Sequence, residues 1–175
     1  MSFLDQFAIQ FAGLQPGLYN FEFEVSEKFF ERFTESEIKK GTVNVHVELQ
    51  KQARMMELLF TLDGSVMITC DRCLDEFNFP VDYQSKLIVN FGKNKGEVTE
   101  EIITISESDH EINLAQYIYE FIHLALPMKK IHPDNEKGVS TCNREVMKKL
   151  KEHMVITNQT SDDPRWEVLK KLKFN

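Results

Sequence analysis

The chain has 175 residues and a formal net charge of −7, with 42% hydrophobic and 28% charged residues. This length suits one sizeable domain, and this balance is typical of an ordered globular protein. No apolar run approaches the roughly 18 to 20 residues of a membrane-spanning helix. The acidic charge argues against wholesale binding to nucleic-acid phosphates.

The first residues predict a cytoplasmic protein. They carry no basic stretch followed by an uninterrupted apolar one, so no secretory signal is expected. Two of the three cysteines, Cys70 and Cys73, form a C-x-x-C pair, and Cys142 lies far downstream. In a reducing compartment, such a pair indicates metal binding or redox chemistry rather than a structural disulfide.

Alternating apolar and polar residues predict β-strands over the first ninety residues. The alternation is clear in Phe21–Val25 and Val43–Leu49. It continues on both sides of Asp63-Gly64, a dipeptide typical of a tight hairpin turn, so a hairpin is expected there. The further stripes Phe77–Tyr83 and Leu87–Phe91 predict two more strands, and Pro80 indicates an edge position or a bulge. The expected fold class is α+β, with an antiparallel sheet curled into a barrel or sandwich and followed by C-terminal helices.

Helical spacing follows the strands. Asn113 can cap a helix that Pro127 ends, a second helix is expected over Arg144–His153, and Asp163-Pro164 predicts the start of a third. The acidic stretch between residues 97 and 111 is expected to be a solvated loop. We therefore expect residues 1–125 to form a mainly antiparallel β domain closed by a helix. Residues 126–175 are expected to be a loop-rich, basic helical segment packed on it or tethered to it.

Charge is unevenly distributed between these two parts. Residues 1–125 carry 10 Lys and Arg against 21 Asp and Glu, a balance of −11, whereas residues 126–175 carry 11 against 7, a balance of +4. This asymmetry indicates either a segment that faces nucleic acid or an acidic partner, or simply a solvated helical surface.

The cysteines favour zinc as the bound ion. Tetrahedral zinc takes four Cys or His ligands, and the residues that could complete a site with Cys70 and Cys73 are His132 and Cys142. Their spacing is not that of a zinc finger, so the site would be a structural clamp between the sheet and the C-terminal segment. The alternative is three reduced thiols and a surface histidine. Thiol oxidoreductase activity is less favoured, because no helix is expected to begin after Cys70 and lower a thiolate pKa.

Basic and aromatic residues near the proposed clamp predict a surface for RNA or a protein partner. The candidates are Arg72, Lys129, Lys130, Lys148, Lys149, Lys151, Trp166, Lys170 and Lys171. Because Trp166 shares a helical face with Leu169 and Leu172, docking of a protein through this helix is the alternative to RNA contact. No catalytic constellation or phosphate-cradling loop is found, so neither an enzyme nor a small-molecule substrate is expected.

Three stretches, in this order, resemble the YceD family of large ribosomal RNA subunit accumulation proteins. They are the C-x-R-C segment Cys70–Phe77, the L-x-L-P segment Leu124–Pro127 with His132 and Cys142 after it, and the closing Asp163–Lys173 segment. The stretch between His132 and Cys142 is longer than the family pattern. The resemblance implies a cytoplasmic, non-catalytic factor in large-subunit biogenesis and 23S rRNA accumulation. Its partner would be large-subunit ribosomal RNA or a ribosomal or assembly protein.

Overall fold

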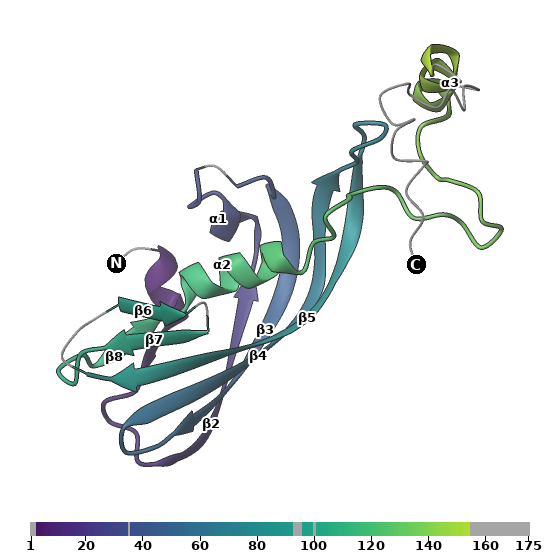
Figure 1. Ribbon diagram of the computed structural model, residues 1–175. Helices are drawn as coiled ribbons and strands as arrows, with labels where there is room; N and C mark the ends of the chain where they lie inside the picture. The colour runs from purple at the N-terminus through teal and green to yellow at the C-terminus, as the bar shows by residue number, and fades with distance from the viewer. Residues whose placement is uncertain (1–2, 35, 93–95, 100, 155–175) are drawn as a thin grey trace, which may run out of the picture.

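A computed structural model describes residues 3–34, 36–92, 96–99 and 101–154 (Figure 1). A short 3-10 helix, η1 (Phe3–Phe7), opens the described chain. The strands are β1 (Ala8–Gln10), β2 (Gly17–Val25), β3 (Lys40–Lys51), β4 (Met55–Thr69), β5 (Glu76–Phe91), β6 (Gly96–Thr99), β7 (Ile102–Ile105) and β8 (Glu111–Asn113). The α-helices are α1 (Glu27–Phe30), α2 (Ala115–Leu124) and α3 (Arg144–His153).

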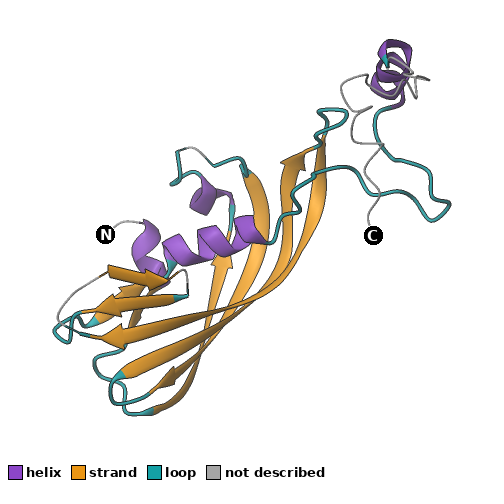
Figure 2. Cartoon of the chain, viewed as in Figure 1, coloured by secondary structure: helices purple, strands orange, loops and turns teal. Residues whose placement is uncertain are grey.

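The main sheet is open, so the expectation of a barrel or sandwich is wrong, whereas the α+β class is confirmed. Its six strands have the order β2-β3-β4-β5-β7-β6, and only β5 and β7 run parallel. The edge strands β2 and β6 do not pair with each other, and β1 pairs separately with β8. Helix α2 lies across one face of the long twisted sheet (Figure 2). A sheet whose single apolar face is covered by helices buries its core without closing on itself.

The predicted hairpin at Asp63-Gly64 is wrong, because β4 continues through both residues. Gly64 pairs with Val43 on one side and Val81 on the other. A Cβ atom on Gly64 would lie 2.2 Å from the carbonyl oxygen of Thr42. The glycine therefore allows β3 and β4 to approach closely, which is the other common reason for a glycine within a strand.

The actual chain reversals lie at the two ends of β4. Gln52 donates its backbone N–H to the carbonyl of Met55 (2.9 Å) at the β3–β4 turn, and the C-x-x-C segment connects β4 to β5. The two stripes predicted as separate strands after residue 76 are the single strand β5. At Pro80, β5 pairs only with β4, since β7 reaches only Ile88–Phe91, which confirms the expected edge position. The acidic stretch predicted as a loop contains β6 and β7.

The core lies between α2, α1 and one face of the sheet. Alternate residues of β3 and β4 are fully buried there, as the sequence alternation predicted. The Phe60 ring of β4 packs edge-on against Phe121 of α2, with ring centroids 5.0 Å apart. The N-cap residue of α2 is Leu114 and not Asn113 as expected, but the Asn113 side chain accepts a hydrogen bond from the N–H of Ala115, the first residue of the helix (2.9 Å).

Helix α3 lies at the end of the described chain and has the bounds expected from sequence. The side chain of Asn143 caps it by accepting from the N–H groups of Glu145 (3.0 Å) and Val146 (3.4 Å). No residue of α3 is buried among the described residues. In the described ranges, no helix is both long and apolar enough to cross a membrane.

Candidate metal centre

The C-x-x-C segment forms the connection between β4 and β5. Cys70 donates its backbone N–H to the carbonyl of Asp75, and Leu74 donates its own to the carbonyl of Cys70, both at 2.9 Å. Leu74 has a φ of 62°, a left-handed conformation that closes the turn. The cysteines therefore sit within the hairpin loop that joins β4 to β5. This tight loop holds Cys70 and Cys73 close together at the end of the sheet where β4 turns into β5.

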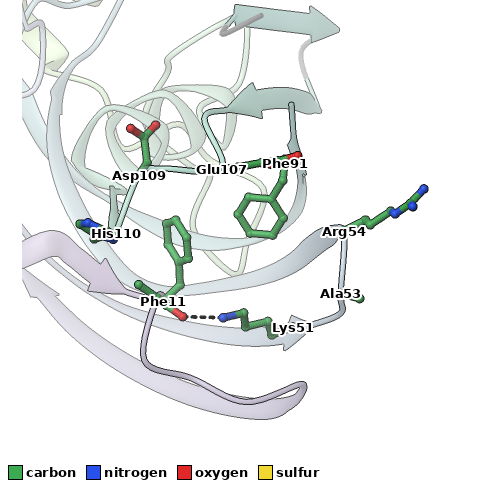
Figure 3. Close-up of a pocket in the computed structure, with 9 residues that line it drawn as sticks. Phe11, Lys51, Ala53, Arg54, Phe91, Glu107, Asp109 and His110 are labelled. Carbon is green, nitrogen blue, oxygen red and sulfur yellow. Dashed lines mark hydrogen bonds between the residues drawn. The ribbon is translucent and has the colours of Figure 1, made fainter. Parts of the chain in front are cut away.

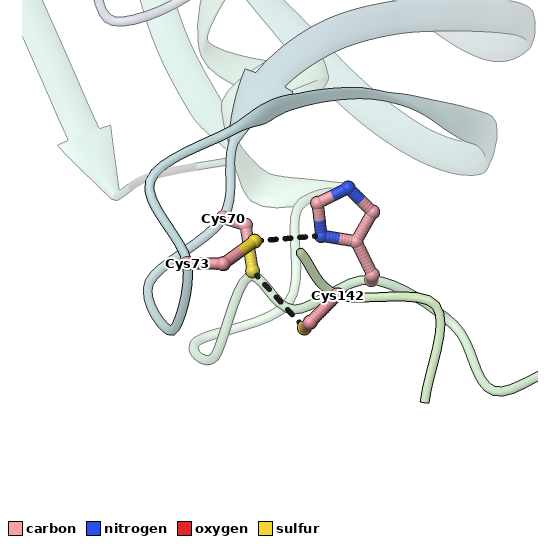
Figure 4. Close-up of side chains that lie close together, drawn as sticks. Cys70, Cys73 and Cys142 are labelled. Carbon is pink, nitrogen blue, oxygen red and sulfur yellow. Dashed lines mark hydrogen bonds between the residues drawn. The ribbon is translucent and has the colours of Figure 1, made fainter. Parts of the chain in front are cut away.

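The segment between α2 and α3 brings the two distant candidates to this loop. The Sγ atoms of Cys70 and Cys142 lie 3.9 Å apart, and the Sγ of Cys73 lies 3.4 Å from Nδ1 of His132. Figure 4 shows the three cysteines converging from the loop and from the C-terminal segment. The ligand atoms of these four residues all lie within 4.8 Å of one another. The four residues selected from sequence thus form one cluster.

The donor set and its spacing fit a zinc ion. Around a tetrahedral zinc with Zn–S bonds of about 2.3 Å, two sulfurs lie about 3.8 Å apart and a sulfur and an imidazole nitrogen about 3.6 Å apart. The observed separations of 3.9 Å and 3.4 Å agree with these values. All three thiols are buried and none is in a disulfide, so each is available as a thiolate ligand. A Cys₃His set with no open position is typical of structural zinc.

Residues around the four candidate ligands contact them and the segments that carry them. Ring packing orients His132, whose imidazole lies 4.5 Å from the Phe77 ring of β5. Arg72 donates from Nη1 to the Ser140 hydroxyl (3.3 Å), and Asn143 donates from Nδ2 to the Asp75 carboxylate (3.0 Å). The hairpin loop therefore holds the C-terminal segment by polar contacts as well as through the four clustered side chains.

The two loop cysteines have opposite pKa shifts. Burial raises the pKa of Cys70, but hydrogen bonds from the backbone N–H groups of Cys73 and Arg72, together with His132, outweigh it and lower the pKa to about 6. Burial raises the pKa of Cys73, and the adjacent thiols of Cys70 and Cys142 raise it further. The lowered pKa of Cys70 favours its thiolate form, and the raised pKa of Cys73 favours its thiol form. A bound cation would favour the thiolate form of both.

The basic residues selected from sequence differ in their surroundings. Lys129, Lys148, Lys149 and Lys151 are exposed, whereas Lys130 forms an ion pair with Glu37. This ion pair lowers the pKa of the Glu37 carboxyl. Arg72, as described above, contacts its own chain. Trp166, Lys170, Lys171 and the helix predicted from Asp163 lie outside the described residues.

A hollow of about 550 Å³ lies between the Cys142 segment and α3. Val139 and Met147 give it an apolar wall, and Arg144, Lys148 and Lys151 add positive charge. Sequence reasoning selected the lysines but missed the apolar wall and the loop contacts of Asp75 and Ser140. The Asn143 cap was detectable, since asparagine directly before a helical pattern is a common N-cap. The loop contacts carried no such local signal.

A larger hollow of about 690 Å³ lies at the opposite end of the sheet (Figure 3). Phe11 and Phe91 pack at its centre with ring centroids 5.5 Å apart. Its lysine, Lys51, is engaged by the carbonyls of Phe11 (2.7 Å) and Leu14 (2.8 Å). Figure 3 shows Arg54 pointing away from the two phenyl rings. Lys51 therefore fixes the loop before β2 and does not offer its charge to a ligand. For this reason we take the cysteine cluster, and not this hollow, as the candidate site.

Comparison with known proteins supports the family resemblance found in the sequence. The family model described as large ribosomal RNA subunit accumulation protein YceD matches residues 58–173. This range includes the hairpin loop, α2, the four clustered residues and α3. No curated protein and no solved structure matches significantly.

Proposed function

We propose that this chain, which belongs to the YceD family, is a non-catalytic factor that supports the accumulation of large-subunit ribosomal RNA. The support comes from the family match over residues 58–173 and from what that range contains. It contains a closed Cys₃His cluster, a donor set typical of structural sites rather than catalytic ones.

The proposed mechanism rests on one observation, the clustering of four potential zinc ligands. These are Cys70, Cys73, His132 and Cys142. Zinc bound there would tie the segment after α2 to the β4–β5 loop. The chain's own residues prepare this tie, since the hairpin backbone orients the two loop thiols and Phe77 orients His132. In this proposal, the clamp fixes where α3 begins, because Cys142 directly precedes the Asn143 cap.

The partner in this proposal contacts the basic surface next to the clamp. Lys148, Lys149 and Lys151 are exposed on α3, and Lys129 is exposed between α2 and the clamp. Lysine ammonium groups on one surface attract RNA phosphates and release counterions, which makes binding strongly salt-dependent. The alternative partner is a ribosomal or assembly protein, which would dock on the apolar wall formed by Val139 and Met147.

Depletion of the protein followed by complementation tests the proposed function. Depletion should lower 23S rRNA and free large subunits while small-subunit rRNA is unchanged, and the natural chain should restore both. Charge reversal at Lys148, Lys149 and Lys151 should fail to restore them. The matched control reverses Lys28, Arg32 and Arg54, which are also exposed; Arg54 lies at the β3–β4 turn, at the opposite end of β4 from the cysteine loop. Unchanged 23S rRNA on depletion would refute the proposal.

A second candidate function, thiol oxidoreductase, is favoured by one observation, the lowered pKa of Cys70 of about 6. Against it, Cys70 is fully buried and its sulfur faces the other donors of the cluster. A redox enzyme would require a Cys70 that reacts rapidly with small disulfides near neutral pH. A thiol that reacts only after a chelator is added would support the metal clamp instead.

A further inference from the structure

Strand β2 forms an open edge of the main sheet. It is the first strand in the sheet order and pairs over its nine residues with β3 alone. Among the described residues, no strand pairs with its other side and no backbone hydrogen bond outside the sheet involves Gly17–Val25. Such an edge presents a row of free N–H and C=O groups to which an extended chain can add.

The side chains of β2 alternate regularly along this edge. Glu22 and Glu24 are exposed on the outer face of the sheet. Phe21 and Phe23 are half-buried on the inner face, where the Phe23 ring lies 5.7 Å from that of Phe7. Each face of the edge therefore has its own chemistry, carboxylate on one side and aromatic on the other.

Open space flanks these same residues on both faces. A hollow of about 460 Å³ on the outer face is lined by Glu22, Glu24, Asn44 and His46, with Phe23 and Val45. A second hollow of about 430 Å³ lies along the edge between β2 and the segments carrying η1 and α1, and is lined by Glu22, Phe23 and Glu24 together with Phe3, Gln6, Phe7, Ser26 and Lys28. An added strand needs room for side chains on alternate faces, and the two hollows supply it.

The charge of the outer face indicates what kind of chain can bind at this edge. The outer face carries three carboxylates and one neutral amide in register, since Glu24 pairs with Asn44, Asn44 with Asp63 and Asp63 with Asp82. RNA phosphates are repelled by such a face. A second copy of β2 added at this edge would place its glutamates beside Glu22 and Glu24, which is unfavourable. A basic segment added beside β2 is attracted directly by Glu22 and Glu24, whereas Asp63 and Asp82 lie on β4 and β5, further from this edge.

We propose that the β2 edge takes up an extended, basic segment of another protein as an additional strand. Lysine or arginine side chains of this segment would lie on the outer face beside Glu22 and Glu24, and apolar side chains would pack beside Phe21 and Phe23. The inference does not depend on the zinc clamp or on the role in ribosomal RNA accumulation. It goes beyond them by assigning a protein-binding surface to a different strand.

Fluorescence anisotropy with a labelled nine-residue peptide in which lysine alternates with valine tests this surface. We expect the full chain to bind it, and the amide protons of β2 to become protected from exchange. Methylation of the backbone nitrogens of the peptide on its inward edge should weaken binding about tenfold or more, since it removes main-chain donors. Binding that survives methylation on both edges would overturn strand addition.

Substitutions in the protein test the charge argument. The double change Glu22→Lys and Glu24→Lys should weaken binding about tenfold or more and favour a peptide that alternates glutamate with valine. The control, Glu111→Lys with Glu152→Lys, makes the same change in net charge at exposed positions away from β2 and should bind normally. Equal loss in both variants would show non-specific attraction and overturn the proposal. Protection of the β2 amide protons from exchange by an RNA oligonucleotide would also overturn the proposal. Self-association of the chain in sedimentation, with the same protection of β2, would overturn it as well.

Discussion

Asp71 and Lys130 are joined by two reciprocal hydrogen bonds. The backbone N–H of Asp71 donates to the carbonyl of Lys130 (2.6 Å), and the backbone N–H of Lys130 donates to the Asp71 carboxylate (2.7 Å). One partner lies in the β4–β5 loop and the other lies two residues before His132. The contact therefore sets the path of the C-terminal segment at the point where it delivers its histidine to the cluster.

Removal of the Asp71 carboxylate should weaken metal binding without removing a ligand. We expect Asp71→Ala to lower zinc affinity by about tenfold, a usual effect of losing a group that orients ligands. Asp71→Asn retains an oxygen that can accept from Lys130 and serves as the matched control, with a smaller loss. Competition with a chromophoric chelator measures both. Identical affinities for Asp71→Ala and the natural chain would show that the contact does not position His132.

Zinc content is the direct measurement on the cluster. Protein purified without an affinity metal should contain about one zinc per chain, because the four donors form a single tetrahedral set. Cys142→Ser should lower zinc affinity by at least about 100-fold, since it removes one ligand. His46→Ala is the control, because His46 is exposed on β3 and outside the cluster. A stable, folded and metal-free natural protein would contradict the clamp.

The clamp also predicts a local change when metal is removed. Chelation should expose the segment 126–154 to protease while the sheet stays intact, because α3 buries no residue of its own. Limited proteolysis with and without chelator, followed by mass spectrometry, locates the cleavage. The variant Cys70→Ser with Cys73→Ser should be cleaved at the same sites without chelator. Cleavage that is unchanged by chelator would separate metal binding from the position of this segment.

The sequence alone predicted the parts of this fold that depend on local pattern. Alternation predicted the buried face of β3 and β4, and helical spacing with Asn113 and Pro127 predicted α2. It did not predict how far each strand continues, because Asp63-Gly64 is compatible with both a turn and a close crossing of two strands. Only the neighbouring Thr42 carbonyl, distant in sequence, distinguishes the two.

The candidate site was predicted by ligand chemistry and not by spacing. Thiols and an imidazole are zinc ligands wherever the chain places them, so Cys70, Cys73, His132 and Cys142 could be selected before any fold was known. The contacts that support them could not, because aspartate and serine in loops are common. Asp71 becomes informative only when the segment carrying Lys130 lies beside it. The open edge of β2 likewise depends on sheet order, which strand patterns do not contain.

Packing between the sheet and α2 should dominate stability. Phe60→Ala removes a side chain that is 1% exposed and contacts Phe121, so it should lower the free energy of unfolding by about 3–5 kcal/mol. Leu59→Ala, one residue away on the opposite face, removes a side chain that is 41% exposed and should cost less than about 1 kcal/mol. Urea denaturation measures both. Similar losses would mean that the outer face is covered in solution.

The stability of the metal-free protein should depend on pH through the two loop thiols. In the folded chain the pKa of Cys70 is about 6, below its ordinary value of 9.0. Between these values the unfolded chain binds a proton that the folded chain has released, so the free energy of unfolding should rise from pH 6 to 9. The raised pKa of Cys73 acts in the opposite direction and should lower stability above pH 9, where the unfolded thiol ionises first.

Urea denaturation with chelator and reductant, repeated from pH 5.5 to 9.5, measures this dependence. Cys70→Ser is the informative control, because it should remove the rise between pH 6 and 9 while leaving the other titrating groups in place. A natural chain and a Cys70→Ser variant with parallel profiles would contradict the shifted thiol. With zinc bound, the dependence should steepen towards acid pH, because protons then compete with the metal for the thiolates and the imidazole.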